Sequence, residues 1–184
     1  MGKIWFTSDL HFGHDRDFIY GPRGFNSVHE MNEALIKNFI DDIAWEDEVY
    51  ILGDCMLGDN SVGLSFLKRI PGKKHIILGN HDTNARVDLY KDVYQTDIIG
   101  YATMFKYHKF TAFLSHYPTL TGNYDDKGSH VVWNLSGHTH SREKFQYWPS
   151  VIYNVAVDAH GCHPVEIETV IVDIKKQKEV SCDA

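Results

Sequence analysis

The stretch Lys74-His75-Ile76-Ile77-Leu78-Gly79-Asn80-His81-Asp82 decides how this chain should fold and where it should act. Its apolar run is typical of a buried parallel strand, and its polar end follows directly after that strand. Functional groups of α/β sheets collect at such carboxyl ends. Asn80 offers a neutral oxygen ligand, and His81 offers a group that titrates near neutral pH. A polar turn after a core strand would explain this segment equally well, so the other strands must decide.

Four other predicted strands end in similar side chains. Asp9 and His11 follow the first strand, and their spacing of two places both on the same side of an extended segment. The predicted strands that carry such residues span 3–8, 48–52, 74–78, 110–114 and 131–135. The candidate metal ligands at their ends are Asp9, His11, Asp54, Asn80, His116, His138 and His140. Each motif is weak alone, but five coincidences at strand ends indicate one metal site.

The first half of the chain alternates strands with helices. Ser27 to Glu30 has the capping-box pattern, and apolar residues recur at helical spacing from Val28 to Ile43. Asn60 or Ser61 should cap a second, short helix, and residues 84–92 should form a third. This alternation predicts right-handed crossovers and parallel strands.

The second half is richer in strands. We expect strands over residues 98–106, 110–114, 131–135 and 152–157, the first two joined as a hairpin. Residues 167–174 fit a final helix, although their β-branched content is almost as compatible with a strand. A loop with His160, Cys162 and His163 precedes this segment, and an accessory metal role for that loop stays open.

Composition indicates one compact domain over residues 1–184. The chain is 43% hydrophobic and has neither an internal linker nor a repeat. Asp9 comes too early for the apolar core of a signal peptide, and no apolar stretch is long enough to cross a bilayer. The three cysteines, Cys55, Cys162 and Cys182, are an odd number without close pairing and therefore favour free thiols. We expect a cytoplasmic protein that does not bind membranes.

Charge and histidine content bear on the partners. The net charge of -7 opposes affinity for long nucleic acid, which basic surfaces usually drive. Twelve histidines, many of them beside glycine or aspartate, favour metal binding. The sequence therefore predicts a small substrate and leaves the oligomeric state undetermined.

Taken together, the motifs resemble the calcineurin-like metallophosphoesterase family over nearly the whole chain. The resemblance is carried, in the family's order, by Asp9-x-His11, Gly53-Asp54, Gly79-Asn80-His81-Asp82, His116 and Gly137-His138-Thr139-His140. It implies a four-layer α/β sandwich, in which two mixed β-sheets are flanked by helices and a two-metal site lies at the sheet ends.

The resemblance also implies a role for each residue. One metal would be held by Asp9, His11 and His140, and the other by Asn80, His116 and His138. Asp54 would bridge both metals, and His81 matches the family's catalytic histidine, which does not bind metal. Mixed imidazole and oxygen ligands favour Mn²⁺, with Fe or Zn²⁺ as alternatives.

The implied reaction is hydrolysis of a phosphate ester. A hydroxide that bridges the two metals would attack phosphorus in line, and His81 would protonate the leaving alkoxide. His14, Arg23 and Arg142 lie in loops near the ligands and could contact the substrate phosphate. A solvent-exposed surface role fits each of these three residues at least as well.

Departures from the family pattern narrow the substrate. Protein phosphatases and dinucleoside-tetraphosphate hydrolases of the family carry Asp-Arg-Gly shortly after the bridging aspartate, where this chain has Cys55-Met56-Leu57-Gly58-Asp59-Asn60. Members that cleave lipid-linked nucleotides typically have arginine where His81 stands. His81 resembles the cyclic-nucleotide phosphodiesterases and repair nucleases, but the nucleases usually carry an added domain that this chain has no room for.

The resulting hypothesis is a metal-dependent phosphodiesterase that acts on a small nucleotide or a similar organic phosphate. A nuclease on short nucleic acid and a phosphomonoesterase are the alternatives. A non-catalytic metal-binding scaffold is a third class, disfavoured because His81 and every candidate ligand are present.

Overall fold

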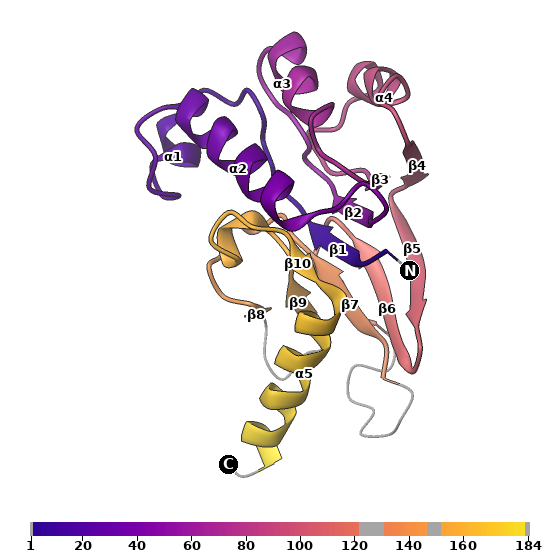
Figure 1. Ribbon diagram of the computed structural model, residues 1–184. Coiled ribbons are helices and arrows are strands. Elements are labelled where there is room, and N and C mark those ends of the chain that lie inside the picture. The colour runs from indigo at the N-terminus through magenta and orange to yellow at the C-terminus, as the bar shows by residue number, and fades with distance from the viewer. Residues whose placement is uncertain (1, 122–130, 147–151, 183–184) are drawn as a thin grey trace.

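The computed structural model describes residues 2–121, 131–146 and 152–182, in which ten strands form two five-stranded sheets (Figure 1). The first sheet has the order β10-β1-β2-β3-β4. Its strands are β1 (Ile4–Thr7), β2 (Glu48–Leu52), β3 (Lys73–Ile77), β4 (Thr96–Gly100) and β10 (Val165–Glu166). Strands β1 to β4 pair in parallel, and β10 pairs antiparallel with β1.

The second sheet has the order β5-β6-β7-β9-β8 and is also mixed. Its strands are β5 (Ala102–Tyr107), β6 (Phe110–Ser115), β7 (Trp133–Ser136), β8 (Phe145–Gln146) and β9 (Ile152–Asn154). Strands β6, β7 and β9 are parallel neighbours, whereas β5 and β8 pair antiparallel at the two edges. The carboxyl ends of β1 and β9 lie side by side, since Ser8 and Ala156, which follow these strands, form a parallel β-bridge. The parallel strands of both sheets therefore end on the same side of the molecule.

Helices flank the sheets and define two cores. The helices are α1 (Asp17–Tyr20), α2 (Val28–Asp42), α3 (Asn60–Leu67), α4 (Asn84–Tyr90) and α5 (Ile167–Cys182), with a 3₁₀ turn η1 (Val157–Ala159) before β10. Leu35 and Phe39 of α2 pack with Ile51 and Ile76 on one face of the first sheet. The other face contributes Phe6 to a core shared with the second sheet and α5. The expected sandwich of two mixed sheets flanked by helices is confirmed.

Most helix predictions are confirmed in position. Ser27 caps α2, its side chain accepting a hydrogen bond from the Glu30 backbone N–H. The cap of α3 is one residue earlier than predicted, because the Asp59 carboxylate accepts from the Ser61 and Val62 backbone N–H groups. The segment that fitted either a helix or a strand is the helix α5.

The predicted strand over residues 98–106 is wrong in one respect. Gly100 has a φ of 116°, a value that glycine adopts without a side-chain clash, and it divides this segment into β4 and β5. β4 pairs with β3 in the first sheet, whereas β5 forms the predicted hairpin with β6 in the second. The chain thus passes from one sheet to the other at Tyr101. The predicted strand 152–157 also ends early, at Asn154.

The loop with three metal-type side chains does not gather them around one point. His160 Nε2 lies 2.8 Å from the Asn154 carbonyl oxygen, and His163 Nδ1 lies 2.7 Å from Asp42. Cys162 is a buried free thiol. Among the residues that the structure describes, the groups able to hold a metal do not include these three. No described helix is both long and apolar enough to span a membrane.

Lys74 of β3 is a buried charge that is not among the candidate metal ligands. Its ammonium group donates to the carbonyl oxygens of Ile70 and Gly72, at 3.0 and 2.7 Å. Only 2% of the residue is exposed, and this burial lowers the pKa of Lys74 to about 8. The folded protein therefore binds this proton less tightly than the unfolded chain does.

Replacing Lys74 with Met removes this titration. Between pH 8 and 10 the unfolded wild type binds more protons than the folded state, so its free energy of unfolding rises with pH there. We expect wild type to gain about 1–2 kcal/mol relative to Lys74→Met between pH 7.5 and 9.5. Urea unfolding of both proteins at the two pH values measures this difference, and a constant difference would contradict the lowered pKa.

Candidate metal centre

The seven candidate ligands meet at one end of the sandwich. The turns after β1, β2 and β3 supply Asp9, His11, Asp54 and Asn80, and those after β6 and β7 supply His116, His138 and His140. The two sheets touch at this end, where the His138 backbone N–H donates to the Asp9 carboxylate at 2.9 Å. Residues 129 positions apart in the chain thereby become neighbours.

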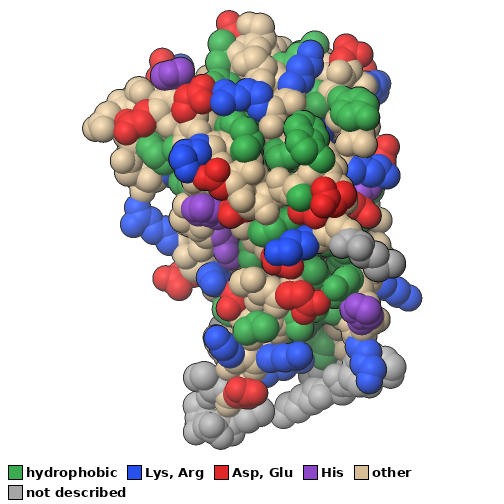
Figure 2. All heavy atoms as spheres, viewed as in Figure 1, with side chains coloured by type: hydrophobic (Ala, Val, Ile, Leu, Met, Phe, Trp, Pro, Cys, Tyr) green, Lys and Arg blue, Asp and Glu red, His purple; other side chains and the backbone are tan. Residues whose placement is uncertain are grey.

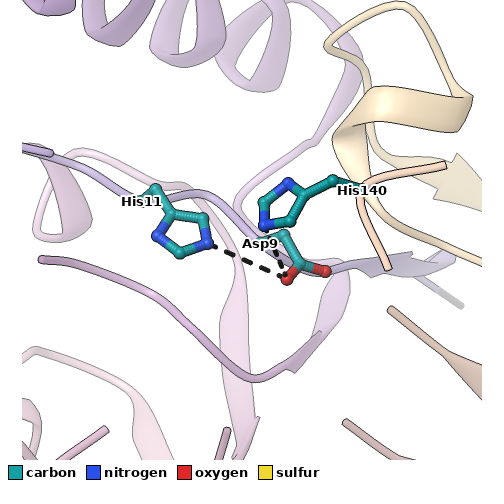
Figure 3. Close-up of side chains that lie close together, drawn as sticks. All are labelled: Asp9, His11 and His140. Atoms are coloured by element: carbon teal, nitrogen blue, oxygen red, sulfur yellow. Dashed lines mark ion pairs between the residues drawn. The ribbon is translucent and has the colours of Figure 1, made fainter. Parts of the chain in front are cut away.

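A first cluster consists of Asp9, His11 and His140 (Figure 3). Asp9 Oδ1 lies 3.9 Å from His11 Nε2 and 3.8 Å from His140 Nε2. Asp9 Oδ1 and His11 Nε2 are buried and have no hydrogen-bond partner among the described residues. The other Asp9 oxygen is occupied by Ser8 Oγ and the His138 backbone N–H. Buried polar atoms are rarely left unpaired, so a cation between these atoms is the simplest explanation.

A second cluster gathers ligand atoms from both sheets. His116 Nε2 lies 3.0 Å from Asn80 Oδ1, 3.2 Å from His138 Nδ1 and 3.4 Å from Asp54 Oδ2. His116 Nδ1 must donate its hydrogen to the Leu52 carbonyl oxygen, 2.8 Å away. In the neutral ring Nε2 is then an acceptor, which faces the acceptor oxygen of Asn80. A metal ion between them would turn this repulsion into coordination.

The atom spacings fit a metal ion of the transition series. Ligand atoms that each lie about 2.1 Å from an ion are about 3.0 Å apart at a right angle and about 3.4 Å apart at the tetrahedral angle. The second cluster has this spacing, with His138 Nδ1 also 3.1 Å from Asn80 Oδ1. The first cluster is wider, with gaps of 3.8 and 3.9 Å. Imidazole with carboxylate ligands suits Zn²⁺, Fe or Mn²⁺ better than Ca²⁺.

Asp54 lies between the two clusters. Its Oδ2 is 3.7 Å from His11 Nε2 of the first cluster and 3.4 Å from His116 Nε2 of the second. Its other oxygen accepts from the His81 backbone N–H at 2.9 Å, which fixes the carboxylate plane. This arrangement agrees with the bridging role that the resemblance implies for Asp54.

Burial controls the protonation of the site. Desolvation, followed by the positive charge of His140 and Arg23, holds the pKa of His11 well below its usual value. His11 is therefore neutral and keeps a lone pair for a metal. Burial also raises the pKa of Asp54, although the nearby His116 opposes this shift. The Asp54 carboxylate in so dry a site needs positive charge nearby to stay ionised.

Two glycines let the ligand turns approach each other. A Cβ on Gly79 would lie 2.3 Å from Asp54 Oδ1, and a Cβ on Gly137 would lie 2.1 Å from Asp9 Oδ2. Any side chain at either position would displace a candidate ligand. The glycines that precede Asn80 and His138 in the motifs are thus required by close approach.

His81 stands outside both clusters. Its ring is 40% exposed, and its Nε2 lies 4.0 Å from Asp54 Oδ2. The backbone is fixed on both sides, because the N–H donates to Asp54 and the carbonyl oxygen accepts from Arg86 at 2.6 Å. The ring therefore faces solvent at a set position beside the ligands.

The three residues proposed to contact substrate differ in their surroundings. Arg23 is almost fully buried and bonds Asp158 twice, at 2.9 and 2.8 Å, as well as the Asp9 carbonyl oxygen. These bonds favour a structural role for Arg23. His14 Nδ1 lies 3.4 Å from His11 Nδ1, and exposed Arg142 donates to the Pro22 carbonyl oxygen. Part of the His14 side chain and much of Arg142 are open to solvent.

Sequence analysis missed the residues that support the ligands. Asp158 accepts from Arg23 and lies 3.2 Å from His140 Nδ1, so it orients that imidazole. Carboxylate partners of this kind are typical of ligand histidines. Arg86 links the His81 carbonyl oxygen to Asn60. Neither Asp158 nor Arg86 stands in a recognisable motif. Their supporting roles become visible only from their hydrogen bonds in the folded structure.

Asp82 is a further supporting residue, and it does belong to a quoted motif. Its carboxylate is buried and accepts from the Gly79 and Asp54 backbone N–H groups, both at 2.8 Å. It also accepts from the Cys55 backbone and from the Tyr90 hydroxyl, at 3.2 and 2.6 Å. One carboxylate thus joins the turns after β2 and β3.

Comparison with known proteins places the chain among relatives. No family model matches the sequence. The uncharacterized protein MJ1445 of Methanocaldococcus jannaschii is 30% identical over 98% of this chain and 96% of its own length. The Gene 66 protein of Mycobacterium phage L5 is 31% identical over 77% of this chain and 79% of its own length.

Solved structures share the fold. A protein of unknown function from Aquifex aeolicus, AQ665, has a TM-score of 0.70 at 22% identity and covers 94% of this chain and 98% of its own. A structure described as a novel archaeal phosphodiesterase has a TM-score of 0.52 at 18% identity, over 84% of this chain and 83% of its own. The chain shares the fold of this phosphodiesterase, and it belongs to one family with MJ1445 and the phage Gene 66 protein. The fold and the gathered ligand residues agree with the resemblance to calcineurin-like metallophosphoesterases that the sequence carries.

Asp82 provides a test of how the ligand turns are held. Asp82→Asn turns one of its oxygens into a donor that faces two other donors, so we expect a loss of about 3–5 kcal/mol in the free energy of unfolding. Tyr90→Phe, the matched control, removes one of the four bonds and should cost about 1–2 kcal/mol. Urea unfolding measures both losses, and equal losses would show that Asp82 does not join the two turns.

Proposed function

We propose that this protein is a phosphodiesterase that uses two divalent metal ions and acts on a small organic phosphate. The observation that supports this most is the convergence of seven ligand side chains into two adjacent clusters, with Asp54 facing both. Two positions for ions, beside a histidine that is not among the ligands, are what metal-assisted hydrolysis requires. Mn²⁺ is the metal we favour for both positions.

Charge supports the choice of a phosphate substrate. Asp9 and Asp54 are the two carboxylates among the candidate ligands, and the remaining ligands are an amide and imidazoles, which bind metal ions in their neutral form. When bound, two divalent ions supply a nucleophilic hydroxide at neutral pH and positive charge that offsets the charge of a phosphate. The seven candidate ligands would hold the ions, and Asp54 would contribute to both positions. The two carboxylates would offset only part of the charge of two divalent ions, so the metal-loaded site would carry a net positive charge.

His81 is the proposed general acid. Three observations support this role: the ring is 40% exposed, the backbone is hydrogen-bonded on both sides, and Nε2 lies 4.0 Å from Asp54. It would donate its proton to the leaving oxygen of the ester. Acid catalysis by such a group is typically worth about 10²–10⁴-fold in rate. A non-catalytic scaffold would not require a histidine beside the metal ligands, so the position of His81 favours an enzyme.

The surface supports a small substrate over long nucleic acid. Acidic and basic side chains are interspersed over the described part of the face in Figure 2, without a continuous basic area. The net charge of -7 acts in the same direction. Hydrolysis of short nucleic acid or of a phosphomonoester remains the alternative to be separated by assay.

Substitution of single ligands tests the two-ion arrangement. His11→Ala should weaken the first position and Asn80→Ala the second, each leaving about one ion per chain. Asp54→Ala should lower the occupancy of both, because its Oδ2 faces both clusters. Elemental analysis and titration calorimetry with Mn²⁺ give the stoichiometries. Wild-type protein with one ion, or Asp54→Ala protein with two, would overturn the bridging arrangement.

Substitution of His81 tests the acid. His81→Ala should keep both ions and lower the turnover of diesters with alkoxide leaving groups by about 10²–10⁴-fold. p-Nitrophenolate leaves without a proton, so diesters that release it should lose much less. An equal loss on both substrates would assign His81 to phosphate binding instead. No loss on either would remove it from the mechanism.

A further inference from the structure

A pocket adjoins the second ligand cluster. It has a volume of about 450 Å³ and is lined by Tyr117, Pro118, Leu120, His138, Thr139 and Ile152. His138 is the residue through which the pocket reaches the candidate metal ligands. Among the lining residues that the structure describes, none carries a carboxylate, an ammonium or a guanidinium group, and this described surface suits an uncharged part of a ligand.

Tyr117 forms an aromatic wall of this pocket. Its ring lies 4.6 Å from the His138 ring and 5.2 Å from the His116 ring, both edge-to-face. The Tyr117 carbonyl oxygen accepts from the Ser115 and Thr119 hydroxyl groups, at 2.8 and 3.0 Å. These bonds fix the backbone at Tyr117, and its ring packs against the two histidine rings, yet 49% of the residue is exposed. Leu120, which is 60% exposed, adds apolar surface beside it.

The exposed surface of Tyr117 matters because of its position beside a ligand cluster. Large apolar side chains gain free energy by burial, and an aromatic ring next to a ligand cluster presents surface that a bound molecule would cover. The pocket and the phosphate position are adjacent, so one molecule can occupy both. The phosphate would lie at the clusters and an organic group on Tyr117.

The position of His81 shows which organic group this is. The His81 ring lies 5.5 Å from the His11 ring and 6.5 Å from the His14 ring, on the side of the first cluster. The leaving group must be within reach of His81, its proton donor. Tyr117 is on the side of the second cluster, beside His116 and His138. The group over Tyr117 is therefore the one that stays attached to phosphorus.

We infer that the pocket beside Tyr117 binds the planar aromatic ring of the retained group, so that the substrate is a diester of a nucleotide. This inference rests on the proposed function and adds the class of substrate. Stacking of a base on an aromatic side chain is generally worth about 10-fold to 100-fold in affinity. The retained product would be a nucleoside monophosphate, with its phosphate at the clusters and its base on Tyr117.

Calorimetric titration of the Mn²⁺-loaded protein tests the inference without turnover. Adenosine 5′-monophosphate and ribose 5-phosphate share sugar and phosphate but differ in the base. Wild type should bind the nucleotide about 10-fold to 100-fold more tightly. Tyr117→Ala should bring the ratio of the two affinities close to one, whereas Tyr117→Phe should keep it. Tyr94→Ala, at a tyrosine that is 75% exposed and follows α4, is the matched control and should also keep it.

A kinetic comparison separates this inference from the proposed function. The p-nitrophenyl ester of thymidine 5′-monophosphate and methyl p-nitrophenyl phosphate have the same leaving group, and wild type should prefer the first through a lower KM. Hydrolysis of both esters with equal KM and equal binding of the two titrants would overturn the aromatic pocket and leave the phosphodiesterase function standing. Nucleotide preference that survives in Tyr117→Ala would place the base elsewhere and also overturn it. Hydrolysis of neither ester, with base-dependent binding retained, would overturn the proposed function alone.

Discussion

The left-handed backbone at the ligand turns is the constraint on which the site depends. Asp9, His11, Asp54, His138 and His140 all have φ values between 50° and 70°. Residues with a Cβ cost about 1–2 kcal/mol each in this region, although Asp and His adopt it more often than most. The turns stay there because the surrounding structure holds them. The His11 backbone N–H donates to the Asp54 carbonyl oxygen, and the Asp54 N–H donates to Asp82.

The same sharp turns explain how so many ligands fit into so small a volume. Asp9 and His11 have a left-handed backbone and not the extended one that the sequence predicted, and this backbone still lets both side chains face the same point with one residue between them. The close approach of Gly79 to Asp54 and of Gly137 to Asp9 then brings turns of different strands together. Replacement of these glycines and relaxation of these turns would have one common effect, the separation of ligand atoms that now lie 3–4 Å apart.

The sequence predicted these candidate ligands because each of them stands in a local signal. Asp9, Asp54 and Asn80 each follow an apolar run, and parallel strands bring their carboxyl ends to one edge. The division of residues 98–106 into β4 and β5 was not predictable in the same way, because Gly100 reads as a residue inside one continuous strand pattern. Asp158 was missed for a different reason. Its partners Arg23 and His140 are distant in sequence, and only the folded chain brings all three together.

The division of the ligands between the sheets has a consequence for the folded state as a whole. The first sheet supplies Asp54 and Asn80, and the second supplies His116 and His138. An ion at the second cluster would therefore cross-link the two sheets. The ion would bind only when the two sheets are packed together. At a concentration 1,000 times its dissociation constant, it would stabilise this packed state by about 4 kcal/mol. Without metal, the contact between the two sheets would be less stable and the catalytic activity would be lost. Amide hydrogens along this contact would then exchange faster with solvent.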